Sequence, residues 1–291
     1  MAPNITNQID ALLPPEMASR AETIGIKKAN MDGLPTFVLA VLAGAFIAQG
    51  AILSTTVTAG CVGTVPYGFI RLFSGVAFSL GLILVVVGGA ELFTGNNLIV
   101  MAWAGGKITF VQLLRNWGFV YVGNFVGALA TAILVYLSGQ YAFGNGAVGA
   151  SALAAAQAKT SFSFGQAVAL GILCNGLVCL AVWLSYGGRS VADKILAIIP
   201  PITAFVAAGF EHSVANMYFI PIGLLIKRGA TQSFWSAIGQ TAADYSHLTW
   251  DSFLINNLLP VTIGNIIGGV ALVGVVYWFV YLRKPRTNAQ S

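Results

Sequence analysis

The chain has 291 residues, of which 57% are hydrophobic and only 8% are charged, and its net charge is +5. Soluble domains carry about 25% charged residues, so this composition argues against a soluble protein and predicts one that lies in a membrane. The basic residues stand singly or in pairs between apolar stretches, which argues against a nucleic-acid partner. The three cysteines show neither a disulfide framework nor metal-ligand spacing, so no metal or cofactor is expected.

The first 36 residues are mixed polar and lack the apolar core of a signal peptide, so no cleavage is expected. After Pro14-Pro15, the side chains of Met17, Ala21 and Ile24 fall on one helical stripe. A proline at the start and a spacing of three to four residues predict a short amphipathic helix at the membrane interface. The alternative is a disordered tail with weak helicity.

Six apolar stretches follow, judged against the ~20 residues that a helix needs to cross a bilayer. The second and the fifth are longer than needed, and each is interrupted by a cluster of Gly, Glu and Asn, at Gly88–Asn97 and at Gly209–Asn216. Such clusters predict broken helices, which are tolerated only where the backbone lines a cavity or is buried in protein. The stretches are Phe37–Val57, Leu72–Trp103, Trp117–Leu137, Phe164–Tyr186, Ile195–Ile226 and Phe253–Leu282.

The distribution of lysine and arginine predicts the orientation. With the N-terminus inside, ten of the 14 lysines and arginines lie on the inner side. This excess predicts that both termini are cytoplasmic, with residues 1–36 as an N-terminal segment and residues 284–291 as a short tail. The four on the outer side are Arg71, Lys159, Lys227 and Arg228.

Two sets of residues recur at fixed separations and reveal an internal repeat. One set recurs after 120 positions and the other after 141. Each half contains three stretches, an odd number, so the second half must cross the membrane in the opposite sense. We therefore expect one channel domain over residues 37–283, with inverted repeats at 37–138 and 162–283. The sets are Gly89, Glu91 and Asn96 with Gly209, Glu211 and Asn216, and Asn116, Gly123, Asn124 and Gly127 with Asn257, Gly264, Asn265 and Gly268.

The polar residues of the breaks each allow two interpretations. Glu91 and Glu211 either hold the irregular backbone by capping free N–H groups, which we favour, or carry protons. His212 has the side chain most easily moved across neutral charge, and we expect it to face the pathway. Its alternative is a neutral histidine satisfied by Asn265 or by a backbone carbonyl. Asn124 and Asn265 either join helices or line a pore.

Other residues of the stretches are less specific. The glycine pairs Gly123/Gly127 and Gly264/Gly268 have the small-xxx-small spacing that permits close helix contact. Three large apolar residues near the breaks allow a hydrophobic constriction, although core or lipid-facing positions are the more common reason for such side chains. These residues are Phe78, Leu82 and Phe205.

Four motifs resemble the formate/nitrite transporter family. The likeness runs from Leu13-Pro14-Pro15 to Tyr277-Trp278, nearly the whole chain. The Phe210-Glu-His form looks most like formate channels, whereas Gly95 departs from them, because formate channels often have Ser or Thr there and the nitrite branch favours glycine. The motifs are Gly88–Asn96, Asn175–Trp183, Gly209–Asn216 and Pro260–Gly269.

The resemblance implies an aquaporin-like fold in a bacterial inner membrane, with protomers that form a homopentamer and each have a pore. It also implies that the N-terminal helix gates the cytoplasmic mouth. By position, the resemblance assigns Phe78, Leu82 and Phe205 to an outer constriction, and Leu92, Thr94, Asn175 and Val178 to the inner side. It assigns His212 with Asn265 and Thr94 to the central selectivity site, and Lys159 to anion attraction.

The sequence therefore predicts a channel, not an enzyme, that passes formate and similar small monovalent anions. In this prediction His212 donates a hydrogen bond or a proton, so that a weak acid crosses nearly neutral. A nitrite or hydrosulfide channel is the alternative within the family. A neutral-solute channel would need two Asn-Pro-Ala boxes, which are absent. A membrane protease using Ser74 or Ser79 with His212 has no nucleophile motif and gives the repeat no role.

Overall fold

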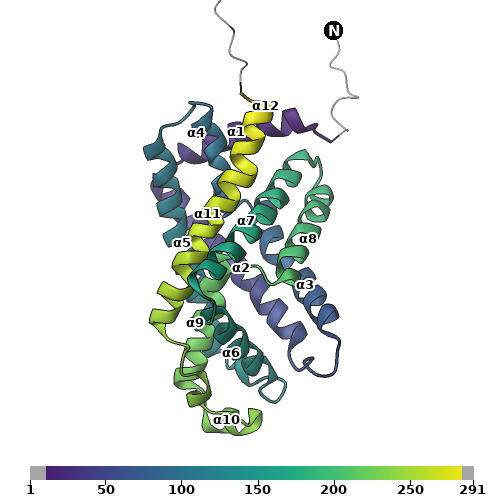
Figure 1. Cartoon of the computed structure of the whole chain (residues 1–291), viewed down its shortest axis with the longest axis vertical. Coiled ribbons are helices and arrows are strands. Elements are labelled where there is room, and N and C mark those ends of the chain that lie inside the picture. Colours follow the sequence, from purple (N-terminus) through teal and green to yellow (C-terminus); the bar gives the residue numbers. More distant parts are fainter. Residues whose placement is uncertain (1–10, 284–291) are drawn as a thin grey trace, which may run out of the picture.

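The computed structural model describes residues 11–283, and all regular structure in that range is helical (Figure 1). Within it, six segments are long and apolar enough to cross a membrane, which confirms the six predicted stretches. The predicted tail 284–291 lies outside the described residues. The segments are α2 (Gly33–Thr58), α3 (Tyr67–Gly88), α5 (Phe110–Leu137), α7 (Phe164–Gly187), α8 (Val191–Ala208) and the composite helix Ser252–Tyr281.

Both predicted breaks are present. The helix α3 stops at Gly88, and helical structure resumes in η2 (Gly95–Ile99) and α4 (Val100–Ala104). The helix α8 stops at Ala208, and α9 (Ser213–Gly229) begins after His212. Each first half-helix ends on a glycine in the left-handed conformation, Gly89 with φ of 80° and Gly209 with φ of 79°. That conformation is strained for residues with a Cβ atom, so the glycine ends the helix.

The last spanning segment differs from its repeat partner. Whereas α5 is a regular α-helix, the composite helix contains two π-helical parts, η5 (Ser252–Leu258) and η6 (Gly268–Gly274). Between and after them lie α11 (Leu259–Ile267) and α12 (Val275–Tyr281). The wider turns of a π-helix re-aim side chains and occur often at functional sites.

The amphipathic helix α1 (Pro14–Ala29) and the alanine-rich helix α6 (Ala147–Thr160) lie toward opposite ends of the molecule (Figure 1). The helix α1 confirms that the amphipathic stripe forms a helix, while its place at the membrane interface stays a prediction. Its Met17 packs with Trp183 and Tyr277. The helix α6 was not predicted, because its Ala-rich sequence is too short and too weakly apolar to span a membrane. Shorter elements are η3 (Gln140–Ala142), α10 (Gln232–Ile238) and η4 (Ala242–Tyr245).

Glycines bring the backbones of neighbouring spans into contact, as the small-xxx-small spacing predicted. A Cβ atom on Gly127 would overlap the Val41 carbonyl oxygen of α2. In the second half, a Cβ atom on Gly264 would overlap the Val168 carbonyl oxygen of α7. The same close approach in both halves packs α5 against α2 and α11 against α7. The two breaks lie against these pairs of helices.

Candidate permeation site

Two cavities approach the middle of the molecule from opposite ends. The Lys28 cavity has a volume of about 220 Å³, and its wall includes Lys28, Glu91 and Leu92. The Lys159 cavity has a volume of about 540 Å³, and its wall includes Lys159 and His212. The first break therefore forms part of the wall of the Lys28 cavity, and the second break forms part of the wall of the Lys159 cavity.

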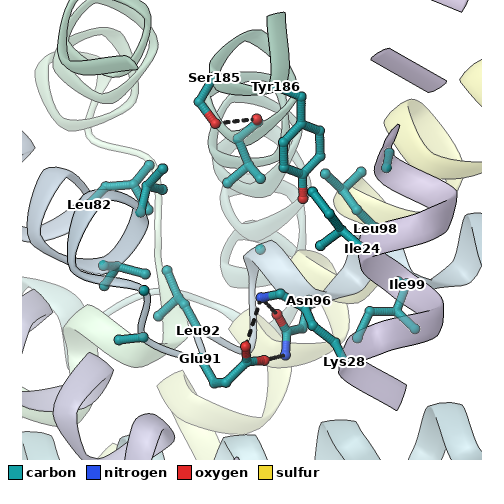
Figure 2. A pocket seen from close by; sticks show the side chains of 18 of the residues that line it. Ile24, Lys28, Leu82, Glu91, Leu92, Asn96, Leu98, Ile99, Ser185 and Tyr186 are labelled. Atoms are coloured by element: carbon teal, nitrogen blue, oxygen red, sulfur yellow. Dashed lines mark hydrogen bonds and ion pairs between the residues drawn. The ribbon is translucent and has the colours of Figure 1, made fainter. Parts of the chain in front are cut away.

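Between the cavities stand large apolar side chains that are almost fully buried. Phe78 and Phe205 line the Lys159 cavity, and their rings meet edge to face with centroids 5.6 Å apart. Leu82, one helical turn after Phe78 on α3, lines the Lys28 cavity together with Leu92 (Figure 2). The three residues of the predicted constriction thus lie where the two cavities approach each other. Their exposed fractions are 2%, 3% and 1% for Phe78, Phe205 and Leu82.

His212 is held by hydrogen bonds at both ring nitrogens. It is the N-cap of α9, where Nδ1 accepts a hydrogen bond from the Ala215 N–H at 3.0 Å. Because Nδ1 is an acceptor, the ring proton of the neutral histidine lies on Nε2, which is 2.9 Å from Thr94 Oγ1. The imidazole N–H therefore donates to the Thr94 oxygen, and the Thr94 hydroxyl keeps its own proton for another acceptor. This pairing joins the two breaks.

Asn265 makes no hydrogen bond to the His212 ring among the described residues, so the alternative in which Asn265 satisfies this histidine is wrong. Its Oδ1 accepts from the Ser213 N–H at 2.9 Å. Its Nδ2 donates to the carbonyl oxygens of Gly171 and Glu211, at 2.8 and 2.9 Å. Asn265 therefore holds the backbone on both sides of His212. Of the two interpretations of this residue, joining helices is the one that the structure shows.

Asn124 makes the equivalent contacts in the first half. Its Oδ1 accepts from the Phe93 N–H at 2.9 Å, and its Nδ2 donates to the carbonyl oxygens of Ala40 and Glu91, at 2.7 and 2.9 Å. The Phe93 N–H and the carbonyls of Ala40 and Glu91 correspond to the groups that Asn265 binds, which are the Ser213 N–H and the carbonyls of Gly171 and Glu211. The repeat is therefore reproduced bond by bond. Both breaks are held by an amide from the last span of the same half.

The two buried glutamates bind side chains and not backbone N–H groups, so the predicted capping is wrong while the structural interpretation stands. Glu211 Oε2 accepts from Asn216 and Asn257, at 2.7 and 3.0 Å. Glu211 Oε1 forms an ion pair with Lys159 at 2.7 Å. In a buried site, such pairing offsets the cost of removing each charge from water.

The first break repeats this arrangement (Figure 2). Glu91 Oε2 accepts from Asn96 at 2.7 Å, and Oε1 pairs with Lys28 at 3.1 Å. Lys28 also donates to Asn96 Oδ1 at 2.8 Å, and Asn96 Nδ2 donates to Asn116 at 2.9 Å. The helix α1, which carries Lys28, is thereby tied to the break.

Lys28 was not predicted as a site residue, because its relation to Lys159 was hidden. The two lysines are 131 positions apart, a separation that differs from both 120 and 141. Asn116 Nδ2 donates to the Lys28 carbonyl and Asn257 Nδ2 to the Lys159 carbonyl, at 3.2 and 2.7 Å. The recurrence of Asn116 and Asn257 was the one signal in the sequence that pointed to these partners.

Three residues that the resemblance assigned to the inner side of the pathway line neither cavity. Thr94, Asn175 and Val178 are buried, and only Leu92 of that set lies on the Lys28 cavity wall. Asn175 Nδ2 donates to Asn97 Oδ1 and to the Asn265 carbonyl oxygen, both at 2.7 Å. Asn175 thus connects the first break to α11 in the last span.

The serine pair of the protease alternative is not arranged for catalysis. Ser74 Oγ lies 2.7 Å from Ser54 Oγ, and Ser79 Oγ donates to the Val76 carbonyl at 2.6 Å. Within the part of the chain that the structure describes, neither serine bonds to His212, whose two ring nitrogens are already engaged. A nucleophile needs its base within hydrogen-bond reach.

Comparisons with known proteins agree with this geometry. A family model described as formate/nitrite transporter matches residues 15–279. The chain is 51% identical to the formate channel FocA of Escherichia coli (strain K12), over 96% of this chain and 97% of that protein. It is 45% identical to the formate channel FocA of Haemophilus influenzae, over 91% of this chain and 93% of that protein.

A solved structure described as a pentameric formate channel with formate bound is similar to this fold. It superposes with a TM-score of 0.82 at 45% sequence identity, covering 86% of this chain and 98% of the other. A second structure, described as an FNT family ion channel, gives a TM-score of 0.77 at 28% identity, covering 91% and 98% of the two chains.

Proposed function

Because the chain belongs to the formate/nitrite transporter family, we propose that it is a membrane channel that passes formate and similar small monovalent anions. The observation that carries the proposal is the pair Thr94–His212, a buried hydrogen-bond donor next to the apolar barrier between two cavities. We further propose that the channel is a homopentamer in which each protomer has its own pathway, as the similar pentameric structure suggests. The chain is not an enzyme, since its family and close relatives are channels and transporters.

In the proposed pathway an anion enters a cavity and reaches the apolar barrier formed by Phe78, Leu82 and Phe205. A hydrated ion pays a large desolvation cost at such a constriction. A small anion recovers part of that cost if a hydrogen-bond donor replaces its lost water. The Thr94 hydroxyl, whose oxygen already accepts from His212, supplies that donor.

The geometry favours hydrogen-bond donation over proton carriage by His212. A second proton on the ring would have to bind Nδ1, which accepts from the Ala215 N–H. Protonation would therefore break the cap of α9, and loss of a cap costs about 1 kcal/mol. In this proposal the ring N–H and the threonine hydroxyl form one polarised chain, and an anion that enters the barrier between the cavities accepts a hydrogen bond from Thr94.

The test is formate flux in proteoliposomes, with and without a proton gradient. His212→Phe removes both the cap and the donor to Thr94, so we expect slower flux and a changed pH dependence. If flux and pH dependence both stay unchanged in this variant, the role assigned to His212 is wrong. An absence of formate flux through the unmodified channel would sink the proposed function itself.

Nitrite is the second candidate, favoured by Gly95. This residue lines the Lys28 cavity, and a Cβ atom there would lie 3.4 Å from Val182. A larger side chain would therefore take volume from the cavity near the barrier. Competition between nitrite and labelled formate in the same proteoliposomes separates the candidates, because the preferred anion inhibits at the lower concentration.

We also propose that the protein lies in the bacterial inner membrane with both termini cytoplasmic. The excess of lysine and arginine on one side supports this orientation. It would place the Lys28 cavity and α1 on the cytoplasmic side, where α1 could act as a gate. Fusions of a cytoplasmic reporter and a periplasmic reporter to the C-terminus test the orientation, and activity of the periplasmic reporter would reverse it.

A further inference from the structure

Arg71 reaches across the Lys159 cavity wall from α3 to the end of α8. Its Nε donates to the Ala207 carbonyl oxygen at 3.2 Å, and a terminal guanidinium nitrogen donates to the Val206 carbonyl oxygen. Arg71, Val206 and Ala208 all belong to the cavity wall. The planar fork of an arginine suits two adjacent acceptors in this way.

The end of α8 would otherwise oppose an anion. The last carbonyl groups of a helix lack the regular intrahelical partner and carry roughly half a negative charge together. The Val206 carbonyl accepts from the Gly209 N–H at 3.1 Å in addition to Arg71. Here the last carbonyl groups of α8 lie on the wall of a cavity that leads to the apolar barrier. By binding two of them, Arg71 replaces a partial negative charge with a net positive one.

Lys159 does not fill this role alone, although the sequence points to it as the anion attractor. Its ammonium group is paired with Glu211 at 2.7 Å, so the two charges largely cancel at a distance. Arg71 has only neutral carbonyl partners, and no carboxylate pairs with it among residues 11–283. Its full charge therefore acts on the cavity.

The other half of the molecule has no such contact. The end of α3 lies on the wall of the Lys28 cavity, whose basic residues are Arg20, Lys28 and Lys194. Arg20 donates to the Tyr186 carbonyl and Lys28 to Asn96. Lys194 Nζ makes no hydrogen bond to the α3 carbonyls in the described structure. The Val85 carbonyl at the end of α3 accepts from the Gly89 and Ala90 N–H groups, at 3.0 and 2.9 Å. Among residues 11–283, a cation therefore binds the carbonyl end of a broken helix in the Lys159 cavity and not in the Lys28 cavity.

We infer that Arg71 sets the positive potential of the Lys159 cavity and so draws small anions toward the barrier, a positioning and selectivity residue beside Lys159. The inference concerns the sign of the potential, and it rests on the proposed function only for the identity of the anion. Arg71 contributes in two ways, through its charge and through its hydrogen bonds to two carbonyl groups. A lysine at this position keeps the charge but cannot form both hydrogen bonds in the same geometry.

The experiment places a cysteine in the cavity as a probe of potential. Ser151 of α6 lines this cavity, and Cys61→Ser removes the partly exposed native thiol, while Cys174 and Cys179 are buried. In the Ser151→Cys channel, the rates of modification by an anionic and a cationic methanethiosulfonate reagent of similar size are compared. The ratio of these rates reports the local potential without any formate flux.

We expect Arg71→Gln to lower the anionic-to-cationic rate ratio about tenfold at low ionic strength, because a unit charge within the cavity acts oppositely on the two reagents. Arg71→Lys should keep the ratio within about twofold. The matched control is Lys227→Gln, since Lys227 also donates to a backbone carbonyl, that of Leu248, but lines neither cavity. That variant should leave the ratio unchanged.

An unchanged ratio in Arg71→Gln would overturn the inference, as would an equal loss in Arg71→Lys, which would point to capping geometry instead of charge. Size-exclusion profiles of the purified variants confirm that each is folded. If formate flux is present, Arg71→Gln should also slow it and flatten its dependence on salt. If flux is absent from the unmodified channel, the proposed function fails, while the rate ratio still decides the role of Arg71.

Discussion

The two breaks share a scaffold but not their chemistry. In each, a left-handed glycine ends a helix, a buried glutamate pairs with a lysine, and an asparagine from the last span of that half holds the backbone. These parts correspond bond by bond. Their agreement shows that the irregular backbone itself is what the duplicated residues maintain.

The breaks differ at the residues between these parts. His212 of the second break stands where the first has Leu92, and Thr94 of the first stands where the second has Val214. Of the four side chains at these positions, Thr94 and His212 bond to each other, and this bond joins the two breaks. At these four positions there is thus one polar pair, Thr94–His212, whereas the repeat-related residues Leu92 and Val214 are both apolar. The asymmetry teaches that the permeation chemistry lies in the residues that the repeat does not share.

The largest effect is expected from removing the glutamate charge. Glu211→Gln leaves Lys159 without its carboxylate, and breaking a buried pair in this way costs about 3–5 kcal/mol. Glu91→Gln should cost less, because the Lys28–Glu91 distance is 3.1 Å against 2.7 Å, and the Lys28 side chain is 24% exposed against 18% for Lys159. Thermal unfolding of the detergent-purified protein measures both losses.

The control for this prediction removes the partner charge as well. The double variant Glu211→Gln with Lys159→Met has no unpaired buried charge, so it should recover part of the lost stability. If the double variant is no more stable than Glu211→Gln alone, the ion pair is not what holds the second break. The order of the two single variants tests whether burial of the lysine sets the size of the effect.

The next effect concerns the two asparagines that hold the breaks. Asn265→Ala and Asn124→Ala each leave one backbone N–H and two carbonyl groups without their side-chain partner, and each should lower the free energy of unfolding by about 2–3 kcal/mol. Their effects on flux should differ, since Asn265 binds the residues on both sides of His212. Unfolding and formate flux measured on the same preparations test this.

If Asn265→Ala and Asn124→Ala lose equal stability but unequal flux, the two breaks share their structural residues while permeation depends on the second break. A matched control is Asn30→Ala, because Asn30 lies at the exposed end of α1 and its two side-chain bonds, to the Ile26 carbonyl and from Gln112, are both exposed. That variant should leave both quantities nearly unchanged. If Asn124→Ala slows flux as much as Asn265→Ala does, the two breaks contribute equally to permeation and the contrast is wrong.

Much of the fold was predictable because the membrane imposes simple constraints. A spanning segment needs a long apolar run, and a polar cluster within it requires a break, so Gly88–Asn97 and Gly209–Asn216 could be found without a structure. Equal separations along the chain then gave the inverted repeat. The helix α6 escaped prediction because alanine-rich sequence of its length carries no spanning signal.

The site was less predictable, because hydrogen-bond partners depend on distances that a sequence does not contain. Asn265 was one of the alternative partners of the His212 ring, but a helix start also offers backbone N–H groups, and the amide oxygen accepts from one of these. The role of Lys28 was missed since charged residues near the N-terminus are usually solvated. Its pairing with Glu91 needs α1 to fold back onto the break, which only the packing of α1 establishes.

A smaller effect on stability is expected when the second break is made like the first. His212→Leu removes the N-cap of α9, which costs about 1 kcal/mol, and also removes the donor to Thr94. His212→Asn keeps a side chain that caps a helix well, but the shorter asparagine cannot extend to Thr94 as the imidazole ring does. We expect both variants to pass formate slowly, and only His212→Leu to lose stability, as judged by flux and thermal unfolding.

Comparing these two variants separates the two functions of one side chain. If His212→Asn passes formate as fast as the unmodified channel, the capping of α9 is sufficient and the donor to Thr94 is not needed. The converse replacement, Leu92→His, adds a polar group to the wall of the Lys28 cavity, where Leu92 lies. It should not restore flux to His212→Leu, because its repeat-related neighbour is Val214 and not a threonine.

The smallest effect is expected at Thr94, and it tests the hydroxyl alone. Thr94→Val gives the first break the residue that the second has at Val214, with nearly the same volume. The His212 N–H then loses its acceptor, and the anion loses the hydroxyl donor proposed for it. The bond to the anion is the one that acts on flux, and its loss of about 1 kcal/mol would slow formate flux about fivefold. Thr94→Ser keeps the hydroxyl and should retain most of the flux, so equal slowing in both variants would assign the effect to packing in the buried site. Full flux through Thr94→Val would show that the unshared polar pair is dispensable, and the division between scaffold and chemistry would then have to be drawn elsewhere.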